Sequence, residues 1–79
     1  MNIKILGSGC SNCKKLYSMA EDAAKELNIT ADLEKIEGLK EIVGYGVMKT
    51  PALVVDEKVK LMGRVPAYKE VLQILKDAQ

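Results

Sequence analysis

Histidine, tryptophan and phenylalanine are absent from this sequence of 79 residues, and only two cysteines are present. Without histidine, two cysteines cannot complete a closed tetrahedral zinc site within one chain. Tyrosine occurs three times and is the only aromatic residue, which argues against a platform on which nucleic-acid bases stack. These absences direct attention to the two thiols.

A charge excess and a long apolar run are missing as well. Twelve Lys and Arg residues against eleven Asp and Glu give a formal charge of +1, so bulk electrostatics favour neither nucleic acid nor an anionic membrane. The apolar stretch of the N-terminal MNIKILGSG is too short for a signal peptide or a membrane span, and no later segment supplies one. We therefore expect a cytoplasmic monomer with no nucleic-acid and no membrane partner.

The composition is that of one small folded domain over residues 1–79, because this length leaves room for a single modest core. Hydrophobic residues make up 48% of the chain and charged residues 29%, without a low-complexity block, which is typical of a globular rather than a disordered protein.

Hydrophobic periodicity indicates alternating strands and helices. The apolar residues from Cys13 to Leu27 recur at helical spacing and predict the firmest helix. Pro66 suits the opening of the last helix. The expected elements are a strand at 2–6, a helix at 13–27, a strand at 29–36, a short helix at 37–45, a hairpin with strands at 52–55 and 59–62 around a turn at 56–58, and the final helix.

This order predicts an α/β fold of the type β-α-β-α-β-β-α. A strand-helix-strand start implies a parallel pair joined by a right-handed crossover, whereas strands joined by a tight hairpin are antiparallel. The sheet should therefore be mixed and four-stranded, with helices on both faces.

The two cysteines, in the segment CSNC at 10–13, follow the first strand and open the first helix. Loops at the carboxyl ends of strands in such sheets are favoured sites for chemistry. Unpaired amides and the helix dipole stabilise a thiolate at a helix start, so Cys10, near the N-cap, should titrate below its free value of about 8.5 and act as nucleophile. Cys13, on the apolar stripe, should be more buried and resolve a mixed disulfide.

The neighbours of the cysteines fit this assignment. Gly7 and Gly9 permit a tight turn and let another backbone approach the sulfur closely. Lys14 and Lys15 either lower the pKa of the thiols or are simply solvated; we favour the second interpretation, because exposed charges act weakly through water.

The CxxC after a first strand and the Thr-Pro before a late strand, in TPALVV at 50–55, resemble the thioredoxin-fold superfamily. The length and the segments KILGSGC and LMGRVP are most similar to small archaeal and bacterial thioredoxin-like proteins, sometimes called redox-active disulfide proteins. The resemblance covers essentially the whole chain.

The resemblance implies a sheet order of 2-1-3-4 and a Cys10–Cys13 disulfide as the only redox group, with no other cofactor. It implies that Pro51 follows a cis peptide bond beside the dithiol, and that the Thr50 backbone and Gly9 contact a substrate segment. Thioredoxins hold a buried carboxylate where this chain has Lys4, which we expect to reach out to solvent.

The sequence thus predicts a thiol–disulfide oxidoreductase that reduces or exchanges disulfides in partner proteins and is itself reduced by a thioredoxin-reductase-like enzyme or a low-molecular-weight thiol. Three alternatives remain. The same two thiolates can grip a soft metal such as Cu(I), as in a metallochaperone module, or four of them in a dimer can hold zinc. The pair can form a structural disulfide, or the fold can serve as a scaffold. Arg64 could bind a glutathione carboxylate, although we expect it to be solvated.

Overall fold

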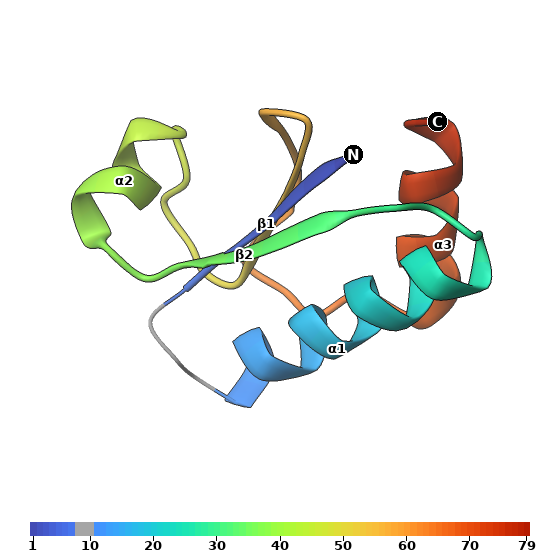
Figure 1. Ribbon diagram of the computed structural model, residues 1–79. Coiled ribbons are helices and arrows are strands. Elements are labelled where there is room, and N and C mark those ends of the chain that lie inside the picture. Colours follow the sequence, from blue (N-terminus) through green and yellow to red (C-terminus); the bar gives the residue numbers. More distant parts are fainter. Residues whose placement is uncertain (8–10) are drawn as a thin grey trace.

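The computed structural model describes residues 1–7 and 11–79. The predicted order of elements is confirmed (Figure 1). The elements are β1 (Asn2–Leu6), α1 (Ser11–Glu26), β2 (Asp32–Ile36), α2 (Leu39–Gly44), β3 (Ala52–Val55), β4 (Lys58–Met62) and α3 (Tyr68–Asp77).

The sheet has the strand order β2-β1-β3-β4, as predicted. β1 runs parallel to β2, and the other neighbouring pairs are antiparallel. In the parallel pair Leu6 lies opposite Ile36, so both strands end at the same edge of the sheet. The start of α1 and the segment after β2 therefore approach that edge together.

Helices cover both faces of the sheet, because side chains along each strand alternate between the faces. In β1, Ile3 and Ile5 point to α1 and α3, whereas Leu6 points to the side of α2. Figure 1 shows α1 and α2 on opposite sides of the strands, and α3 packs on the same core as α1.

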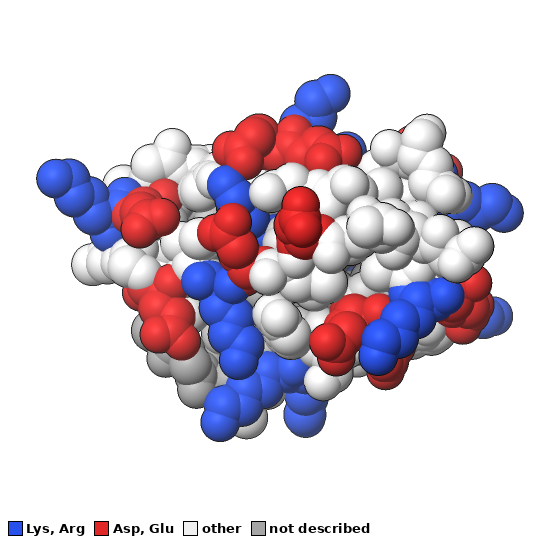
Figure 2. Space-filling view, viewed as in Figure 1, with Lys and Arg blue, Asp and Glu red and all other residues white. Residues whose placement is uncertain are grey.

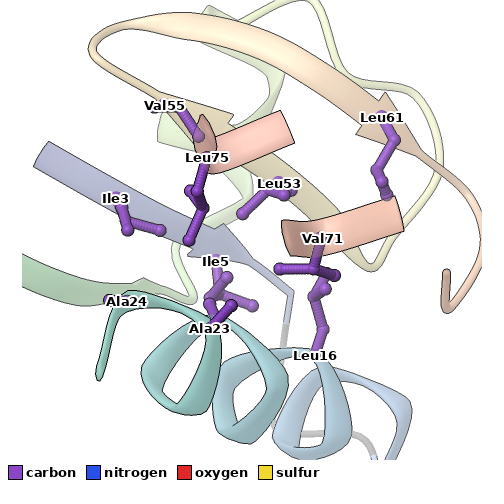
Figure 3. Packing of buried hydrophobic residues seen from close by; sticks show 11 residues of the cluster. Ile3, Ile5, Leu16, Ala23, Ala24, Leu53, Val55, Leu61, Val71 and Leu75 are labelled. Atoms are coloured by element: carbon purple, nitrogen blue, oxygen red, sulfur yellow. The ribbon is translucent and has the colours of Figure 1, made fainter. Parts of the chain in front are cut away.

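The core under α1 and α3, here the α1/α3-side core, is the larger of the two. In Figure 3 Leu16 from α1 and Leu75 from α3 face strand residues such as Ile5. Burying such side chains removes apolar area from water at about 25 cal/mol per Å², the dominant favourable contribution to folding. Its buried members are Ile3, Ile5, Leu16, Ala20, Ala23, Ala24, Leu53, Val55, Leu61, Val71 and Leu75.

The core under α2, here the α2-side core, is smaller and has a partly polar border. Tyr45 and Val59 pack against it. Its buried members are Leu6, Ile36, Ile42, Val47, Ala52 and Val54.

Several element boundaries differ from those predicted. β2 begins at Asp32 rather than at Ile29, because Asn28 turns the chain with a left-handed φ of 56° and the Ile29 N–H still bonds to the Ala24 carbonyl. Ile29 packs against the α1/α3-side core from outside the sheet. Ile29 is therefore apolar because it packs on the core just after the end of α1, and not because it belongs to a strand.

The hairpin turn is shorter than predicted, because β4 begins at Lys58. Asp56 and Glu57 form the turn with φ values of 48° and 68°, the left-handed conformation that two-residue hairpin turns require. Asp56 also accepts a hydrogen bond of 2.8 Å from the Asn2 N–H, which fixes the turn against β1.

None of the helices in the described part of the chain is long and apolar enough to cross a membrane. Basic and acidic side chains share the face shown in Figure 2, and neither sign dominates it.

Candidate functional site

The described part of the candidate site begins where β1 ends. The Gly7 N–H donates a hydrogen bond of 2.9 Å to the Ile36 carbonyl, which extends the pairing of β1 with β2 by one residue. Cys13 lies in the first turn of α1 and is buried, with 6% of its surface exposed. The predictions for Cys10 and Gly9 fall outside the described residues.

Gly7 lies directly against the sulfur of Cys13. A Cβ built on Gly7 would overlap the Cys13 Sγ, and the same Cβ would lie 3.6 Å from the Thr50 Cβ. Glycine is required here for space, because any side chain would occupy the volume of the sulfur. Thr50, which is distant in sequence, therefore lies close to Gly7 and the Cys13 thiol.

The segment that contains Thr50 and Pro51 leads into β3. The peptide bond between these residues is cis, Pro51 is buried and Thr50 is exposed. The Pro51 carbonyl accepts a hydrogen bond of 2.9 Å from the Gly63 N–H, so the segment is bound to the chain that follows β4. This arrangement places the exposed residue Thr50 close to Gly7 and the Cys13 sulfur.

A small cavity of about 50 Å³ opens beside Cys13. That volume exceeds the space of roughly 10–15 Å³ that one water molecule needs. α1, β1, β2 and the residue after β2 all contribute to the wall. The lining residues are Ile5, Gly7, Cys13, Lys14, Lys35 and Glu37.

Lys4 does not reach out to solvent, and that expectation is wrong. Its side chain is only 15% exposed, and its Nζ donates hydrogen bonds to Tyr45 Oη at 2.6 Å and to Glu57 Oε1 at 2.7 Å. The Tyr45 hydroxyl in turn donates to Glu57 Oε2 at 3.1 Å. These three side chains form one network on the α2 side of the sheet, whereas the β1 side chain that faces Cys13 is Ile5.

The Lys4 network shifts the pKa of both charged partners. The hydrogen bond from Lys4 to Glu57 raises the pKa of Lys4 and lowers the pKa of Glu57, and Tyr45 acts in the same direction on each. Both side chains are therefore charged throughout the neutral pH range.

Arg64 was expected to be solvated. It is exposed, but it also forms an ion pair with Glu70. Its Nη1 donates to Glu70 Oε1 at 2.8 Å, and its Nη2 contacts Glu70 Oε2. The hydrogen bonds to Glu70 raise the pKa of Arg64, and those from Arg64 lower the pKa of Glu70. The pair joins the segment after β4 to the first turn of α3.

No group of three or more metal-ligating side chains gathers among residues 1–7 and 11–79. A pair of thiolates from Cys10 and Cys13 falls outside that observation, because Cys10 is not among these residues.

Comparisons with known proteins agree with the fold. A family model described as a thioredoxin domain matches residues 1–76. This chain belongs to the thioredoxin-domain family. A thioredoxin from Methanothermobacter thermautotrophicus is 44% identical over 75 residues, which cover 95% of this chain and 97% of that protein. A thioredoxin from Methanocaldococcus jannaschii is 32% identical over 74 residues, which cover 94% of this chain and 85% of that protein.

Membership in the thioredoxin family confirms the resemblance drawn from the sequence and makes the chain a thioredoxin-like redox protein. The charged wall of the cavity, by contrast, was not predicted. Lys35 and Glu37 flank Ile36 at the carboxyl end of β2, and parallel strands place those ends at one edge. The same edge rule that located the cysteines could have located these two residues.

Proposed function

We propose that this protein is a small thiol–disulfide oxidoreductase whose Cys10 and Cys13 cycle between dithiol and disulfide and so reduce or exchange disulfides in partner proteins. The observation that carries the proposal is the position of Cys13: a buried sulfur in the first turn of α1, against Gly7 and beside exposed Thr50. Membership in the thioredoxin family supports it.

The first step forms a mixed disulfide. The Cys10 thiolate attacks one sulfur of the substrate disulfide, the substrate S–S bond breaks, and the leaving sulfur takes up a proton. Stabilisation of that thiolate is expected from the unpaired amides at the start of α1. Cys10 is the nucleophile in this scheme because it precedes α1 in the sequence, whereas Cys13 lies within α1 and is buried.

The second step releases the reduced substrate. Cys13 loses its proton and attacks the Cys10 sulfur, which forms the Cys10–Cys13 bond and breaks the bond between Cys10 and the substrate. The substrate leaves with the second electron pair and a proton. A thioredoxin-reductase-like enzyme or a low-molecular-weight thiol then returns two electrons to the disulfide, so no further cofactor is needed.

Substrate binding is assigned to the segments around the sulfur. Thr50 is exposed while Pro51 is buried, so the backbone at Thr50 can pair with an extended substrate segment while the following residue anchors it. Gly9, which carries no side chain, would let that segment approach the thiols. A protein disulfide in an extended loop fits this description better than a compact small molecule.

Two single substitutions test the mechanism. Cys10→Ser should abolish turnover of a protein disulfide, whereas Cys13→Ser should accumulate a covalent adduct between Cys10 and the substrate, because the resolving thiol is missing. Insulin reduction is measured with a thioredoxin reductase, with a glutathione system and with dithiothreitol as parallel electron donors, and adducts are detected by mass spectrometry. Normal turnover in either variant would refute the proposal.

A further inference from the structure

Lys49 and Thr50 are neighbouring exposed residues in the segment that leads into β3. A Cβ built on Gly7 would lie 3.6 Å from the Thr50 Cβ, so the Thr50 side chain lies on the side of Gly7 and the thiol. A Cβ built on Gly63 would lie 3.1 Å from the Cβ and 3.3 Å from the Cδ of Lys49, so the aliphatic stem of Lys49 lies across Gly63. A charged side chain therefore stands one residue away from the place where a substrate segment is proposed to pair.

The stem of Lys49 is held by the chain that follows β4. Gly63 adopts a left-handed φ of 79°, and its N–H donates a hydrogen bond of 2.9 Å to the Pro51 carbonyl. A lysine stem can pack on a neighbouring surface while its ammonium group stays in water. Because this contact restricts the stem, less side-chain entropy is lost when the ammonium group binds a carboxylate.

The charge of Lys49 is not matched within the described part of the chain. Among residues 1–7 and 11–79, no carboxylate lies within ion-pair distance of the Lys49 ammonium group. The nearby Arg64, which follows Gly63, differs in this respect, because Glu70 binds its guanidinium group. The ammonium group of Lys49 is therefore available to a carboxylate of a bound partner.

We propose that Lys49 selects substrates in which the extended segment beside the disulfide carries an aspartate or a glutamate. The inference rests on the proposed function and names a charge preference of the same site. A substrate segment paired with the Thr50 backbone would lie within one residue of Lys49, and consecutive Cα atoms are only about 3.8 Å apart. Its side chains would thus come within reach of the ammonium group, and an exposed pair of opposite charges favours binding by a factor of about three.

The test compares peptide substrates that differ in one charge. Each peptide contains a disulfide and carries Glu, Gln or Lys at one of the three positions on either side of a half-cystine. The reduced protein is mixed with each peptide, and the rate constant for its oxidation is followed by alkylation and mass spectrometry, so no electron donor takes part. At the position that faces Lys49, the Glu peptide should react about three times faster than the Gln peptide, and the Lys peptide should react slowest.

Variants of Lys49 test whether this residue is the source of the preference. Lys49→Met should bring the Glu and Gln peptides to equal rate constants, and Lys49→Glu should make the Lys peptide the fastest. Lys49→Arg should retain the wild-type order, because arginine keeps the charge. Ionic strength of about 1 M, at which the Debye length is about 3 Å, should remove the wild-type preference.

Lys25→Met is the matched control for Lys49→Met. Lys25 is an exposed lysine in the last turn of α1, about 18 Å along the helix from Cys13. Its replacement changes the net charge of the protein by the same amount but should keep the preference for the Glu peptide.

The inference is overturned if the wild-type protein reacts no faster with the Glu peptide at any position, or if Lys49→Met retains the preference. It is also overturned if Lys25→Met loses the preference to the same extent, because net charge and not position would then be responsible. These results leave the proposed function intact, since it requires only that the reduced protein reacts with the disulfides. If the wild-type protein reduces none of the peptides, the proposed function fails, and this inference fails with it.

Discussion

The two faces of the sheet use a lysine in opposite ways. On the α2 side, Lys4 is tied to Tyr45 and Glu57 by hydrogen bonds and lies away from the thiol. On the α1 side, the Nζ of Lys35 lies over the ring of Tyr17, and Lys35 lines the cavity beside Cys13. The first arrangement ties the segment after α2 and the hairpin turn to β1, whereas the second places a charged residue at the wall of the cavity.

The comparison teaches that position along a strand does not determine the role of a charged residue. Lys4 and Lys35 stand on neighbouring parallel strands, yet side chains one residue apart in register point to opposite faces. We therefore expect changes on the α1 side to alter chemistry and changes on the α2 side to alter stability.

The largest effect is expected for Gly7→Ala. The added methyl would occupy the place of the Cys13 Sγ, so either the sulfur or the backbone must move. Overpacking of this kind costs about 1–3 kcal/mol of folding free energy, and displacement of the resolving thiol should abolish turnover. Urea unfolding and insulin reduction measure the two effects.

Gly44→Ala is the matched control for that substitution. A Cβ at Gly44 meets no described atom within 4 Å, and the residue ends α2. Alanine in a helix should stabilise the protein by about 0.5–1 kcal/mol and leave turnover unchanged. If Gly7→Ala resembled Gly44→Ala in both measurements, the close contact with Cys13 would be wrong.

The smallest effect, confined to stability, is expected for Lys4→Met. The pKa of Lys4 is raised in the folded state, so its contribution is present below the unfolded value of about 10.4 and is lost as pH rises through the folded value. The pKa of Glu57 is lowered, so its contribution is present above the unfolded value of about 4.3 and is lost in acid. The stability difference from wild type should therefore be greatest at neutral pH and shrink toward both extremes.

Urea midpoints at several pH values measure this difference, and insulin reduction should stay close to wild type. Lys58→Met serves as the control, because Lys58 is an exposed residue that adjoins the same turn. A loss of turnover in Lys4→Met without a loss of stability would contradict the division between the two faces.

Much of the fold could be predicted from local patterns. The helical stripe from Cys13 and the apolar strands placed the elements, because burial dictates their periodicity. The sheet order followed from the resemblance to the thioredoxin-fold superfamily. The start of β2 could not be predicted, because Ile29 is apolar for a contact with the core outside the sheet. Sequence periodicity does not distinguish a strand residue from one that closes a helix.

The sequence predicted those features of the site that depend on a residue's place in a strand or helix. It did not predict features that depend on contacts with residues far away in the sequence. Cys13 was expected to be buried in the first helix, and it is. The hydrogen-bond partners of Lys4 are 41 and 53 residues away in the sequence. One of them, Glu57, is also a left-handed residue of the hairpin turn. Only the folded chain brings such groups together.

The central claim is that Cys10 and Cys13 form a reversible redox couple, and a redox titration tests it most directly. The protein is equilibrated with defined ratios of oxidised and reduced dithiothreitol or glutathione, alkylated, and analysed by mass. The account predicts one two-electron transition between the dithiol and an internal disulfide, at a potential between about −270 and −120 mV. A pair that never closes, or one that stays oxidised below about −300 mV as structural disulfides do, would contradict it.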